Sequence, residues 1–356
     1  MSVPAKLQEP NLARRHRIGK AFEWLCCGST WFGVVVLGVL LLSVGWKAVT
    51  WPAPKAMPAN SPATAVAEQT SAPLSMKFLT SYDSRKPREA GILAALWGSL
   101  WLIMLVALFS VPIGVGSAVY LEEYSNEGRI KQIIQINLSN LAGVPSIVYG
   151  ILGMTAFVKM FGLFHKEEAK SLVINLLFTT VDVPLPFDRT LISGALTLTL
   201  LVLPTVIVAS QEALRAVPSL IRIASYALGA TQWQTIRHQV VPAALPGIMT
   251  GVILALSRAM GEAAPLMLIG ALTYVAYTPG DITNLSDIFK NPQGLLDAPF
   301  DKFTALPLQI YNWINHPRAE YSHLAAAAIV VLLTILLLMN TAAILIRHRF
   351  QKQTRW

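Results

Sequence analysis

The stretch QEALRAVPSLIRIASYALGATQWQTIRHQVVPAALPGIMTGVILALSRAMGEAAP, from Gln211 to Pro265, decides the fold of this chain. Its first half has a mixed, helical pattern that a glycine and several prolines punctuate. Its second half is an apolar run, and about 20 apolar residues cross a bilayer as a helix. A polar connector before such a run predicts a membrane protein that meets a soluble partner at the connector.

The composition agrees with a membrane protein of several spans. The chain has 356 residues, of which 54% are hydrophobic and only 13% are charged, and its mean hydropathy is +0.53. A soluble domain carries about 25% charged residues. The net charge of +9 suits a chain beside anionic lipid headgroups. The charges lie at the termini and in loops, which argues against nucleic-acid binding.

Six apolar runs follow one another along the chain, so we expect an all-α membrane protein with six transmembrane helices. For the first run, a cleaved signal peptide is the alternative to a membrane span. The run is longer than the apolar core of a signal peptide, and no small-x-small cleavage site follows it directly. The six expected spans are Trp24–Trp46, Ile92–Tyr120, Leu138–Phe164, Thr190–Ser210, Pro246–Tyr274 and Ser322–Ile346.

The segments between the runs give the domain organisation. Residues 1–23 form a basic tail, residues 47–89 a proline-rich loop, and residues 347–356 a second basic tail. Residues 90–346 form the core with five spans and the connector 211–245. Six spans place both termini on one side of the membrane, and the basic clusters at both ends assign that side to the cytoplasm.

Two charges lie inside the fifth run. Arg258 and Glu262 are four residues apart, which places them on one face of a helix. A charge at bilayer depth costs about 2.5–3.5 kcal/mol on insertion scales and marks a functional site by default. The alternative is a structural ion pair between packed helices. A guanidinium suits oxyanions because its fork of N–H groups matches two oxygens at once.

The connector is expected to form a hairpin of two helices at the membrane surface. Gly229 separates the helical segments Ser219–Leu228 and Thr231–Val240, and prolines follow them. Spacing alone leaves a plain loop as the alternative. Gly247 and Gly251 form a small-xxx-small pair that predicts a close helix contact.

Motifs of soluble catalysis are absent from the sequence. There is no H-E-x-x-H, no G-x-S-x-G and no G-x-x-x-x-G-K-S/T, so the chain has no phosphate loop with which to be its own ATPase. The histidines are scattered, and the only cysteines, Cys26 and Cys27, are adjacent. Neither pattern has metal-ligand spacing. We therefore expect neither an enzyme nor a metal site.

The connector resembles the EAA motif of ABC importer permeases, E-A-A-x3-G-x9-I-x-L-P. Ala224, Ser225, Gly229 and Pro242 stand in register with that motif. The leading Glu of the motif is Ile223 here, and its Ile and Leu are replaced by the Gln and Val at 239 and 241.

A closer resemblance is to the PstA family, a permease subunit of phosphate importers. It covers roughly Phe78–Arg347, and its most specific part is the segment Arg258-Ala-Met-Gly-Glu262. The stretches that carry it are EALRAVP (Glu212–Pro218), ALGATQWQTI (Ala227–Ile236), LPGIMTGVILALSRAMGEAAPL (Leu245–Leu266), PIGVGSAVYLEEY (Pro112–Tyr124), AGVPSIVYGILG (Ala142–Gly153) and FLTSYDSRKPREAGILAALWGSL (Phe78–Leu100).

The resemblance implies a type I ABC importer permease in a bacterial inner membrane. It implies a homologous PstC-like permease, a PstB-like ATPase dimer that holds ATP and Mg, and a periplasmic phosphate-binding protein. This chain itself would carry no cofactor. Arg258 and Glu262 would line the substrate path. The residues expected to couple the chain to the ATPase are Glu212, Arg215, Arg222, Ala224, Gly229 and Pro242.

Two other functions remain open from the sequence. The first is a permease for another oxyanion, such as molybdate, sulfate or phosphonate. The second is a membrane scaffold or sensor that relays phosphate status. The spans, the connector and the charge pair fit all three readings, and only the resemblance favours phosphate.

Overall fold

The computed structural model describes residues 12–51, 73–126, 128–159, 171–176, 179–184, 188–271, 274–283 and 292–353. The described residues therefore include the basic tail 1–23 only from residue 12 onward. Residues 52–72 of the expected proline-rich loop and the end of the expected third span, from residue 160, lie outside the described residues.

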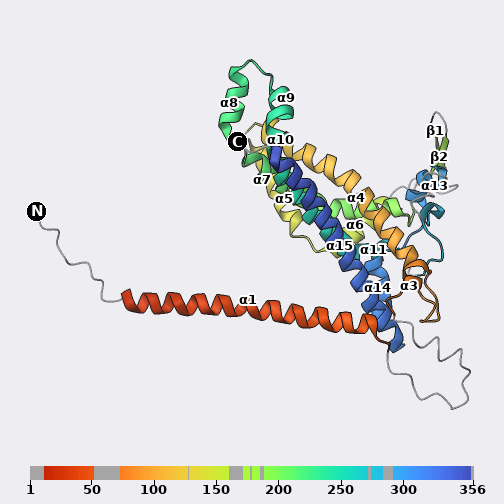
Figure 1. The fold of residues 1–356 in the computed structure, drawn as a ribbon. Helices are drawn as coiled ribbons and strands as arrows, with labels where there is room; N and C mark the ends of the chain where they lie inside the picture. The colour runs from red at the N-terminus through yellow and green to blue at the C-terminus, as the bar shows by residue number, and fades with distance from the viewer. Residues whose placement is uncertain are drawn as a thin grey trace, which may run out of the picture.

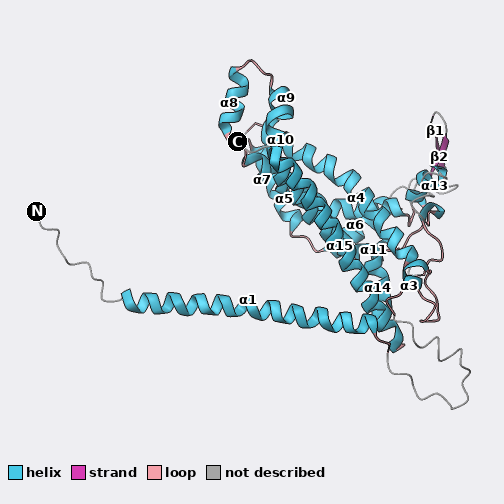
Figure 2. Cartoon of the chain, in the orientation of Figure 1, coloured by secondary structure: helices cyan, strands magenta, loops and turns pink. Residues whose placement is uncertain are grey.

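Long helices dominate the structure (Figures 1 and 2). Five of the described helical segments are long and apolar enough to cross a membrane, and a bent helix pair makes a sixth crossing if it counts as one span. This arrangement agrees with the predicted all-α membrane fold. The helices that carry the five crossings are α1 (Leu12–Val49), α4 (Leu93–Val119), α7 (Leu191–Arg215), α10 (Val241–Gly261) and α15 (Ala319–Gln353).

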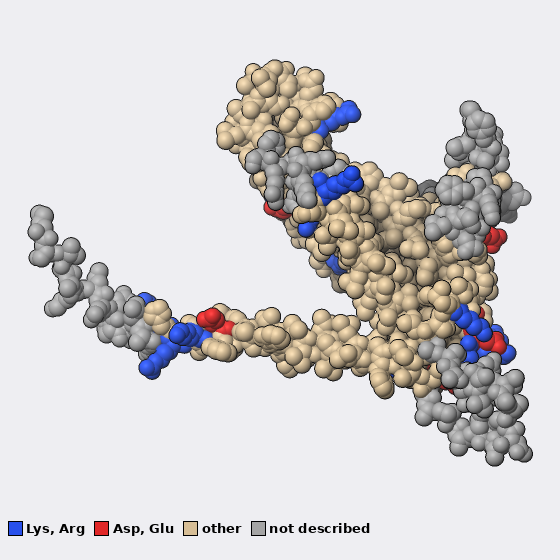
Figure 3. Space-filling model, viewed as in Figure 1, with Lys and Arg blue, Asp and Glu red and all other residues tan. Residues whose placement is uncertain are grey.

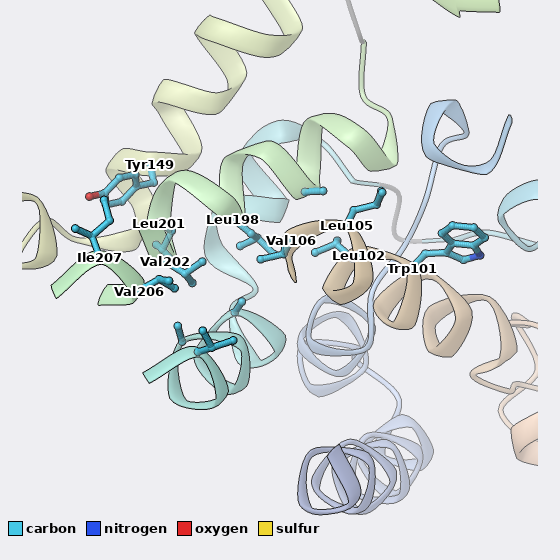
Figure 4. Close-up of a cluster of buried hydrophobic side chains, with 14 of the residues drawn as sticks. Trp101, Leu102, Leu105, Val106, Tyr149, Leu198, Leu201, Val202, Val206 and Ile207 are labelled. Atoms are coloured by element: carbon cyan, nitrogen blue, oxygen red, sulfur yellow. The ribbon is translucent and has the colours of Figure 1, made fainter. Parts of the chain in front are cut away.

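The core of the bundle lies between α4 and α7. Val106 of α4 and Leu198, Val202 and Val206 of α7 are completely buried, and Figure 4 shows these side chains between the helices. A membrane interior offers little hydrophobic drive for helix association, so close packing has to hold these helices together.

Glycines allow α10 to approach α7 closely. A Cβ on Gly251 would lie 2.3 Å from the Cβ of Ala209, and a Cβ on Gly247 would lie 2.7 Å from that of Ala213. Both distances are too short for any side chain. The close contact predicted from the small-xxx-small pair is therefore confirmed, and its partner is α7.

The third expected span is not one continuous helix. In place of a helix over Leu138–Phe164, α5 (Arg129–Ala142) begins earlier and is followed by α6 (Ser146–Gly153) and the π-helical η2 (Met154–Lys159). The two parts are bent by 104°. The break falls at Gly143–Val144–Pro145, where proline restricts the preceding residue and cannot continue the helical hydrogen bonding.

Helix α1 stands away from the bundle and meets it only near its C-terminal end (Figure 1). No residue in its apolar window is buried. Ala48 is buried at the contact, where the Nδ1 of His323 in α15 lies 3.1 Å from the carbonyl oxygen of Lys47. The apolar surface of α1 is thus left open to lipid or to another membrane helix.

Short elements cap the end of the bundle opposite the connector. They include α3 (Met76–Thr80), α13 (Pro292–Asp297), α14 (Leu306–Ile314) and the short helices η5 (Pro279–Asp281) and η6 (Ala298–Phe300). A two-stranded antiparallel hairpin, β1 (Ser171–Leu176) and β2 (Thr179–Pro184), pairs Ser171 with Pro184. This hairpin was not expected from the sequence.

Candidate functional site

The predicted charge pair forms at the end of α10. Arg258 lies in the last turn of this helix, and its Nε is 3.7 Å from Oε1 of Glu262. The Arg258 side chain is 45% exposed and that of Glu262 is 22% exposed. The chain alone therefore does not enclose the pair, although it sits within the apolar fifth span.

The helix breaks directly at this pair, which differs from the expected continuous span. Glu262 has extended backbone angles, φ −83° and ψ 116°, and a second short helix, α11 (Ala264–Ile269), follows. Pro265 has no N–H to donate to the carbonyl of Gly261, so a continuous helix cannot form there. Glu262 is therefore the residue just beyond α10 rather than a member of its last turn.

The broken end is a polar position inside a span. Unwound backbone at membrane depth is tolerated only where it is buried in protein or lines a cavity with water. Arg258 also lies where the carbonyl groups of a helix C-terminus favour a cation. Both features fit a place where a charged solute passes.

Neighbouring helices hold α10 through polar contacts that the sequence reading did not identify. The Oγ of Ser257 donates to Oδ1 of Asn340 in α15 at 2.6 Å. About two helical turns nearer the connector than Ser257, Nη1 of Arg347 donates to Oγ1 of Thr250 at 2.9 Å. Arg347 was expected only to end the sixth span, but its guanidinium turns toward α10.

The connector forms the predicted hairpin. Helix α8 (Ser219–Ala227) ends before Gly229, whose φ of +81° lies in the left-handed region that glycine tolerates best. Thr231 and Gln234 form a capping box at the start of α9 (Gln232–Thr235), which the π-helical η4 (Ile236–Val240) continues. The Oγ atoms of Ser225 and Thr235 lie 2.8 Å apart and tie the two arms together.

Two of the expected coupling residues pair with glutamates of the bundle, although the Arg215 side chain stays 46% exposed. Nη2 of Arg215 donates to Oε1 of Glu122 at 2.7 Å, and Nη2 of Arg222 donates to Oε1 of Glu123 at 2.6 Å. Both glutamates lie in the π-helical η1 (Tyr120–Tyr124), which extends α4. The four residues form what we call the hairpin brace.

Arg222 is the better enclosed half of the brace. Its Nη1 also donates to the carbonyl of Val217 at 2.9 Å, and its Nη2 to that of Leu214 at 3.1 Å. The Glu123 side chain is only 8% exposed. Two adjacent glutamates at the end of a span, opposite arginines in the connector, were the available signal for this brace in the sequence.

The remaining coupling residues are accessible. Glu212, Ala224, Gly229 and Pro242 are exposed on the hairpin or next to it. Large apolar side chains are exposed beside them, and the tip residue Leu228 is 89% exposed. This apolar surface was not predicted from the sequence. Its other members are Leu220, Ile223, Tyr226 and Trp233.

No cluster of three or more His, Cys, Asp or Glu side chains with metal-binding geometry occurs among the described residues. The chemistry available at the charge pair is therefore that of a guanidinium and a carboxylate.

Comparison with known proteins places these features in a family. Residues 110–355 match the family described as binding-protein-dependent transport system inner membrane component. A crystal structure of a bacterial alginate ABC transporter, in complex with its pentasaccharide-bound periplasmic protein, has a chain of the same fold. The TM-score is 0.55 at 12% identity, over 94% of this chain and 96% of that chain. This likeness confirms the predicted importer-permease fold.

Curated relatives agree with the motif resemblance. The probable ABC transporter permease YqgI of Bacillus subtilis is 31% identical over 62% of this chain and 69% of the relative. The phosphate transport system permease PstA 1 of Mycobacterium tuberculosis (strain H37Rv) is 34% identical over 64% of this chain and 60% of the relative. The PstA protein of Haemophilus influenzae is 29% identical over 71% and 74%.

The aligned region spans between 60% and 69% of the length of the first three relatives, all of which are named as transport permeases. The resemblance to PstA proteins predicted from the motifs is confirmed by these matches. The family match, which covers more than half of the chain, decides the assignment. The chain belongs to the family of inner-membrane components of binding-protein-dependent transport systems.

Proposed function

We propose that this chain is the permease subunit of an ABC importer for inorganic phosphate. In this proposal a partner ATPase hydrolyses ATP with Mg, and this chain carries no catalytic activity of its own. The observation that carries the proposal is the half-exposed Arg258 beside Glu262 at the break between α10 and α11. The printed names of several relatives, which are phosphate transport permeases, support the choice of anion.

Arg258 is proposed to meet the anion where water is scarce. The ion pair with Glu262 is long, at 3.7 Å, so the guanidinium keeps N–H groups for a second partner. An oxyanion takes two of these groups at once. Glu262 competes for the same guanidinium, which limits how tightly the anion is held and lets it leave.

A homologous PstC-like permease is proposed to cover the exposed side of the charge pair and complete the path. A relative named PstC, from Mesorhizobium japonicum, is 31% identical to this chain over 192 residues, which supports two homologous halves. The exposed charges in a span require such a cover, because lipid does not solvate them.

The hairpin is proposed to dock on a PstB-like ATPase dimer through its apolar surface around Leu228. The hairpin brace would then pass motion of the ATPase to α4 and α7, and η4 continues directly into α10. A periplasmic phosphate-binding protein is proposed to deliver the anion at the opposite end of the bundle. The hairpin and both termini would thus be cytoplasmic.

Uptake of labelled phosphate tests the proposal. Cells that lack their own PstA-type subunit would receive this chain with its partner subunits, either unchanged or with Arg258→Gln. We expect uptake with the unchanged chain and a decrease of about 10- to 100-fold with Arg258→Gln, since a hydrogen bond to a charged group contributes about 1.5–3 kcal/mol. Arg258→Lys keeps the charge without the fork and should give an intermediate rate.

The control is Lys86→Gln, which removes a positive charge from an exposed residue at the far end of the bundle. Equal uptake by the Arg258→Gln and unchanged chains, at equal membrane levels, would remove Arg258 from the path. Uptake of sulfate or molybdate in preference to phosphate would overturn the choice of substrate.

A further inference from the structure

A second polar site lies at the end of the bundle opposite the hairpin. A pocket of about 480 Å³ opens there between the segment before α4, the loop after α11, and the junction of α14 with α15. Charged side chains gather at this end of the molecule, at the lower right of Figure 3. The lining residues that matter here are Asp83, Arg85, Asn312, His316 and Arg318.

Two buried polar atoms of residues that line this pocket have no hydrogen-bond partner among the described residues. They are Oδ1 of Asp83, which is an acceptor, and Nδ2 of Asn312, which is a donor. The other carboxylate oxygen of Asp83 accepts a hydrogen bond from Nε2 of Gln309 at 2.8 Å. Buried polar atoms are normally paired. A ligand that satisfies both atoms offers a donor to Asp83 and an acceptor to Asn312.

The charges of the lining favour an anion. Arg85 and Arg318 contribute two guanidinium groups, against the single carboxylate of Asp83. Nη1 of Arg318 donates to the carbonyl of Arg85 at 3.3 Å, which holds this guanidinium close to the segment that carries Asp83. Among the described lining residues the balance of full charges is thus positive, with His316 beside them.

We propose that this pocket binds phosphate in a protonated form before the anion enters the membrane path. The P–O–H group would donate to Oδ1 of Asp83, an unprotonated phosphate oxygen would accept from Nδ2 of Asn312, and the two guanidinium groups would balance the charge. The inference rests on the proposed function and deepens it by adding an outer site for the same substrate.

Other ligands satisfy fewer of these features. An ionised carboxylate side chain has no donor for Asp83, and a lysine side chain has no acceptor for Asn312 and is repelled by the arginines. Sulfate carries no proton at neutral pH, so the carboxylate repels it. The pocket therefore selects an anion that retains an O–H group.

The pocket is close enough to the charge pair to serve it. At its inner end, α14 begins beside α10, where Pro307 lines a small cavity together with Ala259 and Met260, the two residues after Arg258. At its outer end, Asn312 and Trp313 line the pocket. The small cavity and the pocket therefore lie at the two ends of α14, a helix of nine residues that is about 13 Å long.

Equilibrium binding of ³²P-labelled inorganic phosphate to the purified transporter complex tests the proposal. The complex would carry Arg258→Gln, so that binding at the membrane path does not contribute. We expect labelled phosphate to bind this complex, and binding to weaken at least tenfold when Arg318→Gln is added. Lys86→Gln is the matched control, since Lys86 lies one residue from Arg85 but does not line the pocket.

Asp83→Asn supplies the sharper test. The amide oxygen can still accept from Gln309, while the amide N–H₂ replaces the acceptor that faces the ligand. We expect sulfate to displace labelled phosphate at least tenfold better from Asp83→Asn than from the Lys86→Gln control. Thermal stability of each variant, measured alongside, identifies a chain that has failed to fold, and Arg85→Gln then replaces Arg318→Gln.

The two proposals fail separately. If phosphate is imported but the Arg258→Gln complex binds none, or if Asp83→Asn competes with sulfate as the control does, the outer site is wrong and the proposed function stands. If the unchanged complex imports no phosphate while the pocket binds it with the expected selectivity, the proposed function fails, and the pocket stands as a phosphate-binding site without a role in import.

Discussion

Arg258 keeps nearly half of its side chain exposed although it lies in an apolar helix. Single residues at helix ends carry much of the polar chemistry of this chain, because a helix end leaves backbone groups unpaired. At the end of the bundle opposite the hairpin, Asp301 likewise pairs with a backbone group, since its Oδ2 accepts a hydrogen bond from the N–H of Gly280 at 2.7 Å.

Stability should depend on pH through Asp301. Burial raises the pKa of Asp301 above its ordinary value of 3.8, and the nearby charges of Asp281 and Asp297 raise it further, while the Gly280 N–H lowers it. The folded state then binds the proton more tightly than the unfolded state. The contribution of this carboxyl to stability is therefore full below pH 3.8 and is lost as pH rises through the raised pKa.

Asp301→Asn should remove this loss, because the amide oxygen still accepts from Gly280 and carries no charge. Melting temperatures of the two chains in detergent, measured from pH 4 to pH 8, check the expectation. The variant should gain on the unchanged chain as pH rises. A difference that stays constant over this range would contradict the assignment, and Asp297→Asn should shift the pH response of the unchanged Asp301 toward acid.

Secondary-structure elements are coupled through polar contacts at their ends. The π-helical η1 places the adjacent glutamates of the α4 extension against two arginines, Arg215 at the end of α7 and Arg222 in the first turn of α8. The hairpin is thus fixed to two membrane helices at once. Such a brace resists bending at the joint between connector and span.

The better enclosed pair, Glu123 and Arg222, should show a measurable coupling. In a double-mutant cycle with Glu123→Gln and Arg222→Gln, we expect a coupling free energy of about 1.5–3 kcal/mol, as for hydrogen bonds to charged groups. Thermal or denaturant unfolding of the purified chain gives the stability of each variant. Each single substitution should also lower the amount of phosphate imported per ATP hydrolysed.

The pair Lys86–Glu89 is the control for this cycle. Its atoms are 3.2 Å apart, but the Lys86 side chain is 75% exposed, and exposed pairs contribute about 0–1 kcal/mol. A coupling for Glu123 and Arg222 no larger than that of the control pair would show that the brace does not hold the hairpin.

In the whole molecule, the two polar regions lie at opposite ends of the helix bundle. The hairpin of α8 and α9 is at one end, and α14, which carries part of the lining of the pocket around Asp83, is at the other (Figure 1). In the proposed function, a bilayer between them would separate the face for an ATPase from the face for a binding protein. The exposed α1 and the charge pair between these ends leave surfaces for a second membrane subunit.

This arrangement predicts which residues an impermeant thiol reagent reaches from outside the cell. With Cys26 and Cys27 changed to Ser, the chain has no other cysteine. We expect Tyr311→Cys on α14 to be labelled in intact cells, and Leu228→Cys at the hairpin tip to be labelled only after the membrane is opened. Both positions are exposed, so access alone does not separate them. The reverse pattern would invert the proposed orientation.

The sequence by itself determined four of the six spans as continuous helices, the hairpin and the charge pair, because each is a local pattern. A run of about 20 apolar residues is a membrane helix wherever it occurs. A glycine between helical segments marks a turn, and Gly229 forms one. Spacing placed Arg258 near Glu262, and the motif resemblance pointed to the family that the comparisons confirm.

Only the tertiary structure decided how these parts meet. Arg215 and Arg222 pair with glutamates 93 and 99 positions away, and no local pattern records such a partner. The same holds for the pocket, which joins Asp83 to Gln309 across 226 positions. The 104° bend in the third span and the break at Glu262 depend on how neighbouring helices satisfy unpaired backbone groups. The periodicity of a segment determines its secondary structure, whereas packing determines which side chains come into contact.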